Sequence, residues 1–103
     1  MTKNEYKDMF ETKKQIRAME LAMDAGYGVD PQIYCDALTK HTAYVAKLNS
    51  DAANMTSEEY ECFRLRYVCG LSYHEANMLL TKGLKSESCI RKRISRWLNV
   101  WGV

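Results

Sequence analysis

The series of helix start signals between residues 55 and 101 constrains the fold of this chain most strongly. Thr56 is followed three residues later by Glu59, and Ser72 is followed three residues later by Glu75. This is the spacing of a capping box, in which the two side chains satisfy the free N–H groups at the start of a helix. Each pair therefore predicts the first turn of a short helix.

Glycines and apolar spacing complete three helices in this stretch. Gly70 is expected to end the first helix and Gly83 the second, and Ser86 is the expected N-cap of the third. Helical spacing predicts three apolar faces, made of Tyr60, Phe63 and Tyr67; of Ala76, Leu79 and Leu80; and of Ile90, Ile94, Trp97 and Trp101 with Leu98 beside them. Two short helices joined by a turn, the second of them basic, are typical of a helix-turn-helix unit that reads DNA.

This stretch resembles the DNA-binding fourth region of bacterial sigma factors and is similar to small phage transcription regulators of the ArpU and RinA kind. The residues that carry the resemblance are Leu65, Arg66, Tyr67, Gly70, Leu71, Ser72, Tyr73, Glu75, Ala76, Ser86, Glu87, Ser88, Ile90, Arg93, Ile94, Ser95, Arg96 and Leu98. The resemblance implies a helix-turn-helix that binds duplex DNA with helix 86–101. The chain departs from the family in its turn, because residues 81–85 make it longer than usual.

Composition indicates an all-α protein with two parts. Hydrophobic residues make up 47% of the chain and charged residues 27%, with one proline and five glycines, and alternating β-branched runs are absent. We expect residues 1–50 to form an N-terminal helical hairpin that packs on the rest or dimerises. We expect residues 55–103 to form a three-helix helix-turn-helix unit.

The hairpin is predicted from two further helical patterns. Residues 4–24 form the first, with Asn4 as N-cap and the glycines of 26–28 as its end, and Asp30 and Pro31 start the second. Residues 49–54 are the expected linker. The expected apolar stripes are Met9, Phe10, Ile16, Met19 and Met23, then Tyr34, Leu38, His41, Val45 and Leu48. His41 is interpreted as a packed, hydrogen-bonded side chain.

Charge is distributed unevenly along the chain. Residues 1–56 carry seven Lys or Arg against eight Asp or Glu, whereas residues 82–103 carry six Lys or Arg against Glu87 alone. A net charge of +5 in the last 22 residues indicates an anionic partner. Trp97 and Trp101 anchor the other side of the same helix, so the cations are expected to point in a fixed direction.

Site residues follow from the expected orientation of helix 86–101. Ser88, Arg91 and Lys92 are predicted to read base edges, with Arg91 suited to a bidentate contact with guanine. Glu87 either accepts from a cytosine amine or is a first-turn acid favoured by the helix dipole. Phosphate contacts are predicted for Ser72, Tyr73, Lys82 and Lys85, and the DNA-contacting set also includes Ser86, Ser95 and Arg96.

The remaining arginines have alternative interpretations. Arg93 and Arg96 either touch phosphate or pair with acids such as Glu58, Glu59 or Glu61. For Arg64 and Arg66, salt bridging is the favoured interpretation.

Cysteine spacing predicts no metal site and no cofactor. Cys35, Cys62, Cys69 and Cys89 form no C-x-x-C pair, and each is expected to fill a small apolar niche as a free thiol. The charged start of the chain predicts no signal peptide, and no apolar run is long enough to span a bilayer. We therefore expect the protein in the cytoplasm of a bacterial or phage-infected cell.

Two functional hypotheses follow. The first is a sequence-specific transcription regulator from a phage or mobile element that binds duplex DNA, with a homodimer through the hairpin. The second is a small sigma-like interaction protein that binds and inhibits or redirects a host protein, such as RNA polymerase or a nucleic-acid enzyme. An enzyme is not expected, because no acid pair, Ser/His/Asp set or phosphate-binding glycine loop is present.

Overall fold

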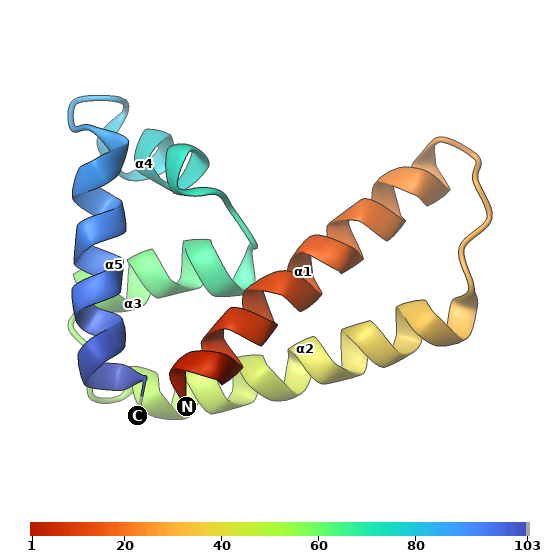
Figure 1. Ribbon diagram of the computed structural model, residues 1–103, viewed down its shortest axis with the longest axis horizontal. Helices are drawn as coiled ribbons and strands as arrows, with labels where there is room; N and C mark the ends of the chain where they lie inside the picture. Colours follow the sequence, from red (N-terminus) through yellow and green to blue (C-terminus); the bar gives the residue numbers. More distant parts are fainter. Residues whose placement is uncertain (103) are drawn as a thin grey trace.

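The computed structural model describes residues 1–102 and contains α-helices and one π-helical segment but no strand within that range. The all-α prediction is therefore confirmed; the last residue of the predicted 55–103 unit lies outside the described residues. The elements are α1 (Lys3–Asp24), α2 (Pro31–Ala52), α3 (Ser57–Phe63), η1 (Arg64–Val68), α4 (Tyr73–Thr81) and α5 (Glu87–Trp101). Helices α1 and α2 form a hairpin whose tip projects away from α3, α4 and α5, while the start of α1 lies near the C-terminal end of α5 (Figure 1).

The start of α1 differs from the prediction that Asn4 is its N-cap. Thr2 is the N-cap: its hydroxyl accepts from the Glu5 N–H at 3.1 Å, and the Thr2 N–H donates to the Glu5 carboxylate at 3.0 Å. Thr2 prevails because it stands three residues before Glu5 and so completes a capping box, which Asn4 cannot do. The predicted start of α2 is confirmed, with Asp30 as N-cap and Pro31 as the first helical residue.

The predicted linker at 49–54 is too long, because α2 continues to Ala52. Asp51, within its last turn, accepts hydrogen bonds from the N-terminal ammonium and from the Tyr6 hydroxyl, each at 3.1 Å. These long-range contacts keep residues 49–52 helical, although the composition of this segment is typical of a loop. The turn between α2 and α3 is therefore restricted to residues 53–56.

The second predicted capping box is complete and the first is half-formed. Ser72 and Glu75 exchange both hydrogen bonds at the start of α4. Thr56 caps α3 as predicted, but the Glu59 carboxylate accepts instead from the Trp101 indole N–H at 2.6 Å. Glu59 therefore ties the start of α3 to the end of α5.

Ser86 is the N-cap residue of α5 by position, but its side chain makes no capping hydrogen bond to the backbone. Its hydroxyl lies 2.9 Å from the Ser88 hydroxyl and 3.5 Å from the Cys89 thiol. The N–H groups at the start of α5 are thus left without the side-chain cap that the sequence predicts.

The helix that begins at α3 widens into η1 before it ends at Gly70. Gly70 has φ +69°, and a Cβ there would lie 2.6 Å from Cγ of Lys13 on α1. Glycine is therefore required both by the backbone conformation and by the close approach of α1. The predicted stop at Gly70 is confirmed, with a packing role that the sequence pattern does not reveal.

One hydrophobic core joins the hairpin to the C-terminal helices. The largest fully buried side chains are Tyr6, Met9, Ile16, Leu48, Phe63 and Ile94. The Phe63 ring centroid lies 5.3 Å from that of Tyr6, 5.5 Å from that of Tyr67 and 6.5 Å from that of Trp97. The predicted packing of the N-terminal part against the C-terminal helices is therefore present.

Several predicted apolar positions are exposed. Leu79 is 65% exposed and Leu80 37%, because α4 is short and turns only Ala76 and Asn77 into the core. On α2, Ala37 is buried and Leu38 is exposed, while Met23 lies near the hairpin tip, beyond the core. The inward positions Ile90 and Ile94 are confirmed, whereas Trp97 and Trp101 are only partly buried.

His41 is buried as predicted, with Nε2 3.0 Å from the Tyr67 carbonyl oxygen. The four thiols are free, and burial raises the pKa of Cys62 to about 11. Cys35 and Cys89 are exposed, contrary to the expectation that each cysteine fills an apolar niche, because both lie on outward helix faces.

Within residues 1–102, no three His, Cys, Asp or Glu side chains are grouped so as to hold a metal ion. No helix of this part of the chain combines the length and apolar character that crossing a membrane requires.

Phe63→Ala is expected to lower the free energy of unfolding by about 3–5 kcal/mol, because it removes a fully buried ring that touches three other aromatic side chains. Urea denaturation followed by circular dichroism measures this loss. Leu84→Ala, at an 89% exposed position, is the control and should change stability by less than about 0.5 kcal/mol. Equal effects of the two substitutions would contradict the assigned core.

Stability is expected to fall as the pH drops from about 7 to about 5, because burial lowers the pKa of His41 below that of a histidine in the unfolded chain, about 6.5. In this pH range His41 binds a proton more readily in the unfolded chain than in the folded protein, so the unfolded state is favoured as the pH falls. His41→Gln keeps a donor for the Tyr67 carbonyl but does not titrate. Urea denaturation at both pH values should show a smaller pH effect in the variant, and an undiminished effect would exclude His41 as the cause.

Candidate nucleic-acid interface

Helix α5 presents one apolar and one polar side. Ile90 and Ile94 are buried, whereas five of the predicted DNA-contacting residues on this helix are exposed. These five are Ser88, Arg91, Lys92, Ser95 and Arg96. The hairpin does not cover them, because α1 meets α5 near its C-terminal end and diverges from it (Figure 1).

Arg91 keeps an accessible side chain although it has two neighbours. Its guanidinium donates to Glu87 at 3.1 Å and lies 5.4 Å from the centre of the Tyr73 ring, with 56% of the side chain exposed. An exposed pair four residues apart contributes only about 0.3–0.5 kcal/mol, so an anionic or base partner can replace it. Lys92 and Arg96 form no ion pair with any residue from 1 to 102.

Two other arginines have structural partners. Arg93 pairs with Glu58 and so holds α5 to α3, which supports the acid-pairing interpretation for Arg93. Arg64 pairs with Glu61 at 2.5 Å, and this hydrogen bond lowers the pKa of Glu61. The salt-bridge prediction is therefore confirmed for Arg64.

Arg66 differs from the prediction, because it has no acidic partner among residues 1–102. Its guanidinium carbon lies 3.7 Å from the Phe10 ring centre and 3.9 Å from that of Tyr73, and Nη1 donates to the Leu71 carbonyl at 3.1 Å. Its Nε is buried and has no hydrogen-bond partner. Two aromatic faces thus replace a carboxylate as the neighbours of this cation.

The start of α4 is occupied by its own capping box. The Glu75 carboxylate accepts from the Ser72 N–H, which lowers the pKa of Glu75, and it lies 3.6 Å from an Arg17 nitrogen. Ser72 is exposed and Tyr73 half-buried. The Ser72 N–H is therefore already engaged, and the neighbouring Tyr73 ring lies 3.9 Å from the guanidinium carbon of Arg66 and 5.4 Å from that of Arg91.

The long turn between α4 and α5 is held from within α4. The buried Asn77 side chain donates to the Lys85 carbonyl at 2.7 Å, and the Thr81 hydroxyl donates to the Asn77 carbonyl at 2.9 Å. Lys82 adopts φ +53° as α4 ends. Asn77 and Thr81 were not predicted as positioning residues, although their spacing of four places them on one helix face.

Lys82 and Lys85 are exposed but lie apart from Arg91. Both line a hollow of about 470 Å³ between α3, α4 and α5, together with Cys89 and Arg93, and Arg91 does not border it. Arg91, Tyr73 and Arg66 therefore lie together on the side of α5 toward α1. Lys82 and Lys85 lie elsewhere, beside the hollow.

Comparison with known proteins adds no assignment, because no family model, curated protein or solved structure matches this chain. Any function must follow from the residues and contacts described above.

Proposed function

We propose that this protein is a sequence-specific duplex DNA-binding transcription regulator of phage or mobile-element type, which reads the major groove with helix 86–101. The observation that supports this most is the orientation of α5, whose isoleucines are buried while Ser88, Arg91 and Lys92 stay open to solvent. An exposed basic helix held rigidly by its apolar side is the feature that groove binding requires.

In this proposal each polar side chain has a defined role. Arg91 makes a bidentate contact with guanine, and Glu87, already hydrogen-bonded to Arg91, orients that guanidinium. Ser88 and Lys92 contact neighbouring base edges. Phosphates are bound by Ser72, Tyr73, Ser86, Ser95 and Arg96, and also by Lys82 and Lys85, which lie apart from Arg91 beside the hollow.

A second candidate function is docking on a host protein such as RNA polymerase. The hollow between α3, α4 and α5 favours it. Leu80 and Leu84 line it, and Leu84 is 89% exposed. An apolar side chain of a partner would fit such a hollow. The two functions differ in salt dependence, because only phosphate binding releases counterions from DNA.

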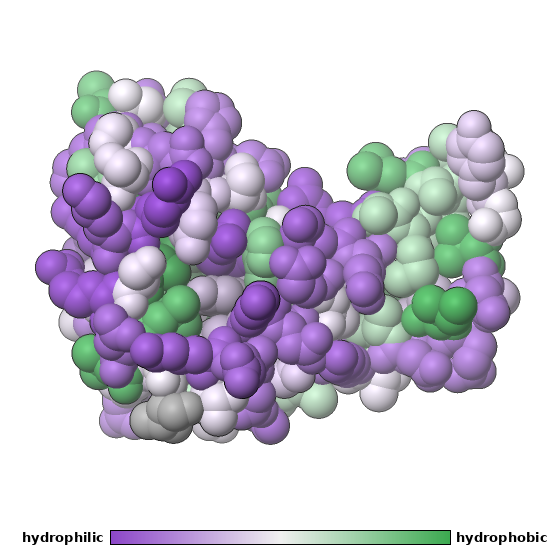
Figure 2. All heavy atoms as spheres, in the orientation of Figure 1, coloured by the Kyte–Doolittle hydropathy of each residue, from purple (hydrophilic) through white to green (hydrophobic). Residues whose placement is uncertain are grey.

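The hairpin tip supports the proposal that two copies act together. Leu21, Tyr27 and Ile33 are 69%, 72% and 59% exposed, and apolar surface is visible at this end of the molecule (Figure 2). A dimer through this surface would leave both α5 helices free for two half-sites, as specific operators usually require.

Arg91→Ala is expected to weaken binding to a site selected from random duplex DNA by about 1–3 kcal/mol and to relax the preference at one base position. Lys85→Ala should weaken all sequences alike and reduce the salt slope by about one unit. Fluorescence anisotropy at several salt concentrations measures both effects. The control is Thr39→Glu, which lowers the net charge by the same one unit at an exposed position of α2. Unchanged affinities for both variants would refute the assignment, and salt-independent binding would favour the second candidate.

Leu21→Lys combined with Ile33→Lys is expected to convert a dimer into a monomer without loss of stability, because both side chains are exposed in the single chain. Size-exclusion chromatography with light scattering at micromolar concentration measures the mass. Leu84→Lys is the matched control, since it places a charge on an exposed leucine elsewhere and should leave the dimer intact. A wild-type protein that is monomeric under these conditions would rule out the dimer.

A further inference from the structure

Helix α1 carries a line of cations that is separate from the predicted DNA-contacting residues. Lys3, Lys7, Lys14 and Arg17 are separated by four, seven and three residues, and Phe10 occupies the position between Lys7 and Lys14. This spacing places all five side chains on one face of the helix. We name this face the basic stripe of α1.

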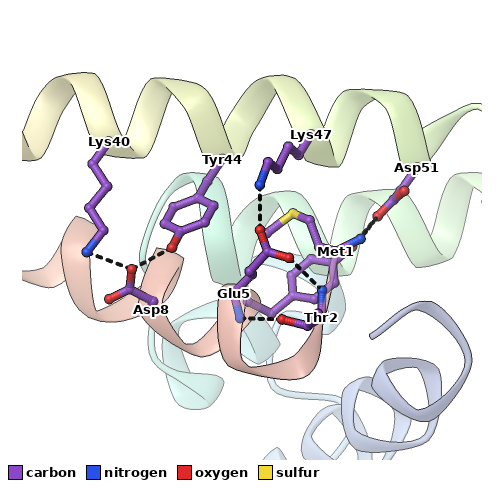
Figure 3. Close-up of polar contacts among 9 residues, drawn as sticks. Met1, Thr2, Glu5, Asp8, Lys40, Tyr44, Lys47 and Asp51 are labelled. Carbon is purple, nitrogen blue, oxygen red and sulfur yellow. Dashed lines mark hydrogen bonds and ion pairs between the residues drawn. The ribbon is translucent and has the colours of Figure 1, made fainter. Parts of the chain in front are cut away.

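The acids near the start of α1 point to a different side. Asp8 lies 2.7 Å from the Lys40 ammonium and accepts from the Tyr44 hydroxyl at 2.6 Å, and Glu5 lies 2.6 Å from Lys47 (Figure 3). The hydrogen bond from Lys47 lowers the pKa of Glu5 to about 2. Because α2 neutralises these two carboxylates, they do not offset the cations of the basic stripe.

Contacts place the basic stripe on the side of α1 that meets the C-terminal helices. The Lys3 ammonium donates to the Asn99 side chain of α5 at 2.5 Å. Further along, Arg17 donates to the Gly70 carbonyl at 2.7 Å and so reaches the segment before α4. The stripe therefore borders α5 at one end and the start of α4 at the other.

An alternating series of cations and aromatic rings connects the basic stripe to the exposed face of α5. Arg91 lies over Tyr73, Arg66 lies between Tyr73 and Phe10, and the Lys14 ammonium is 5.4 Å from the Phe10 ring centre. Each such contact contributes about 0.5–2 kcal/mol. Arg91 and Lys14, at the two ends of the series, are exposed, and Arg66 between the two rings is half-buried. The series shows that Arg91 and Lys14 belong to one continuous surface.

Cations outnumber acids on this surface. Glu11, Glu75 and Glu87 each pair with one cation of the series or stripe, at 3.9 Å from Lys14, 3.6 Å from Arg17 and 3.1 Å from Arg91. Lys7 is exposed and has no ion-pair partner among residues 1–102, and Arg66 has none either. Excess positive charge therefore remains for an external anion.

We propose that the basic stripe of α1 is a second DNA-contacting element, which binds phosphates of the strand bordering the groove that α5 enters. This inference rests on the proposed function. The major groove is about 12 Å wide, so phosphates flank an inserted helix on both sides. Helix α1 begins beside the C-terminal end of α5 and diverges from it (Figure 1). In this proposal, Lys7 and Lys14, both exposed, contact one of the two flanking strands.

The test compares two double variants that lower the net charge equally, by two units. Lys7→Gln with Lys14→Gln removes two of the three exposed lysines of the basic stripe and keeps Lys3, which donates to Asn99. Thr39→Glu with Ala46→Glu adds two acids at exposed positions of α2 and leaves the stripe intact. Each protein is titrated by fluorescence anisotropy with a duplex of mixed sequence between about 50 and 200 mM salt, and circular dichroism verifies the fold.

The stripe variant is expected to reduce the slope of log affinity against log salt by nearly two units, since each phosphate contact contributes about 0.9. The α2 variant should keep the wild-type slope, and Lys7→Arg with Lys14→Arg should restore it. A wild-type slope in the folded stripe variant, or equal reductions in both charge-matched variants, would refute the second contact while leaving the proposed function standing. Absence of salt-dependent duplex binding by the wild-type protein would overturn both.

Discussion

The aromatic cluster of Tyr6, Phe63 and Tyr67 is the interaction on which the rest of the structure depends. Its ring centroids lie 5.0 to 5.5 Å apart, and each residue is at most 4% exposed. Such pairs contribute about 0.5–1.5 kcal/mol beyond the burial of their area. Because the rings come from α1, α3 and η1, with Trp97 of α5 against Phe63, their burial orders four elements together.

Electrostatic consequences follow from this packing. With α1 held between α2 and the C-terminal helices, its acids Glu5 and Asp8 meet the lysines of α2, while Lys14 and Arg17 meet an aromatic ring and a carbonyl group. A helix that has as many acids as bases in its sequence therefore directs Glu5 and Asp8 to one side and the basic stripe to another. Uncompensated positive charge accumulates next to α5, where the apolar anchors Ile90 and Ile94 already turn the basic face outward.

Much of the candidate site could be predicted because α5 is a regular amphipathic helix. Once Ile90 and Ile94 are inside, a period of 3.6 residues places Ser88, Arg91 and Lys92 outside. The neighbours of Arg66 could not be predicted, because Phe10 is 56 positions away and contacts it only when α1 packs on η1. The basic spacing of α1 is visible in the sequence, but its direction depends on which helix attracts Glu5 and Asp8.

Local sequence signals determined the helical class, most helix starts and the glycine stops, because capping boxes and left-handed glycines act within one turn. Tertiary contacts decided the remaining helix boundaries and which charged side chains lie together on the surface. Asp51 stays helical because the chain's own N-terminus and Tyr6 bind it, and Glu59 leaves its capping box because Trp101 lies within reach. In both places the local signal, a loop-like composition at Asp51 and a capping box at Glu59, is worth about 1 kcal/mol or less. A partner distant in sequence can therefore outweigh it.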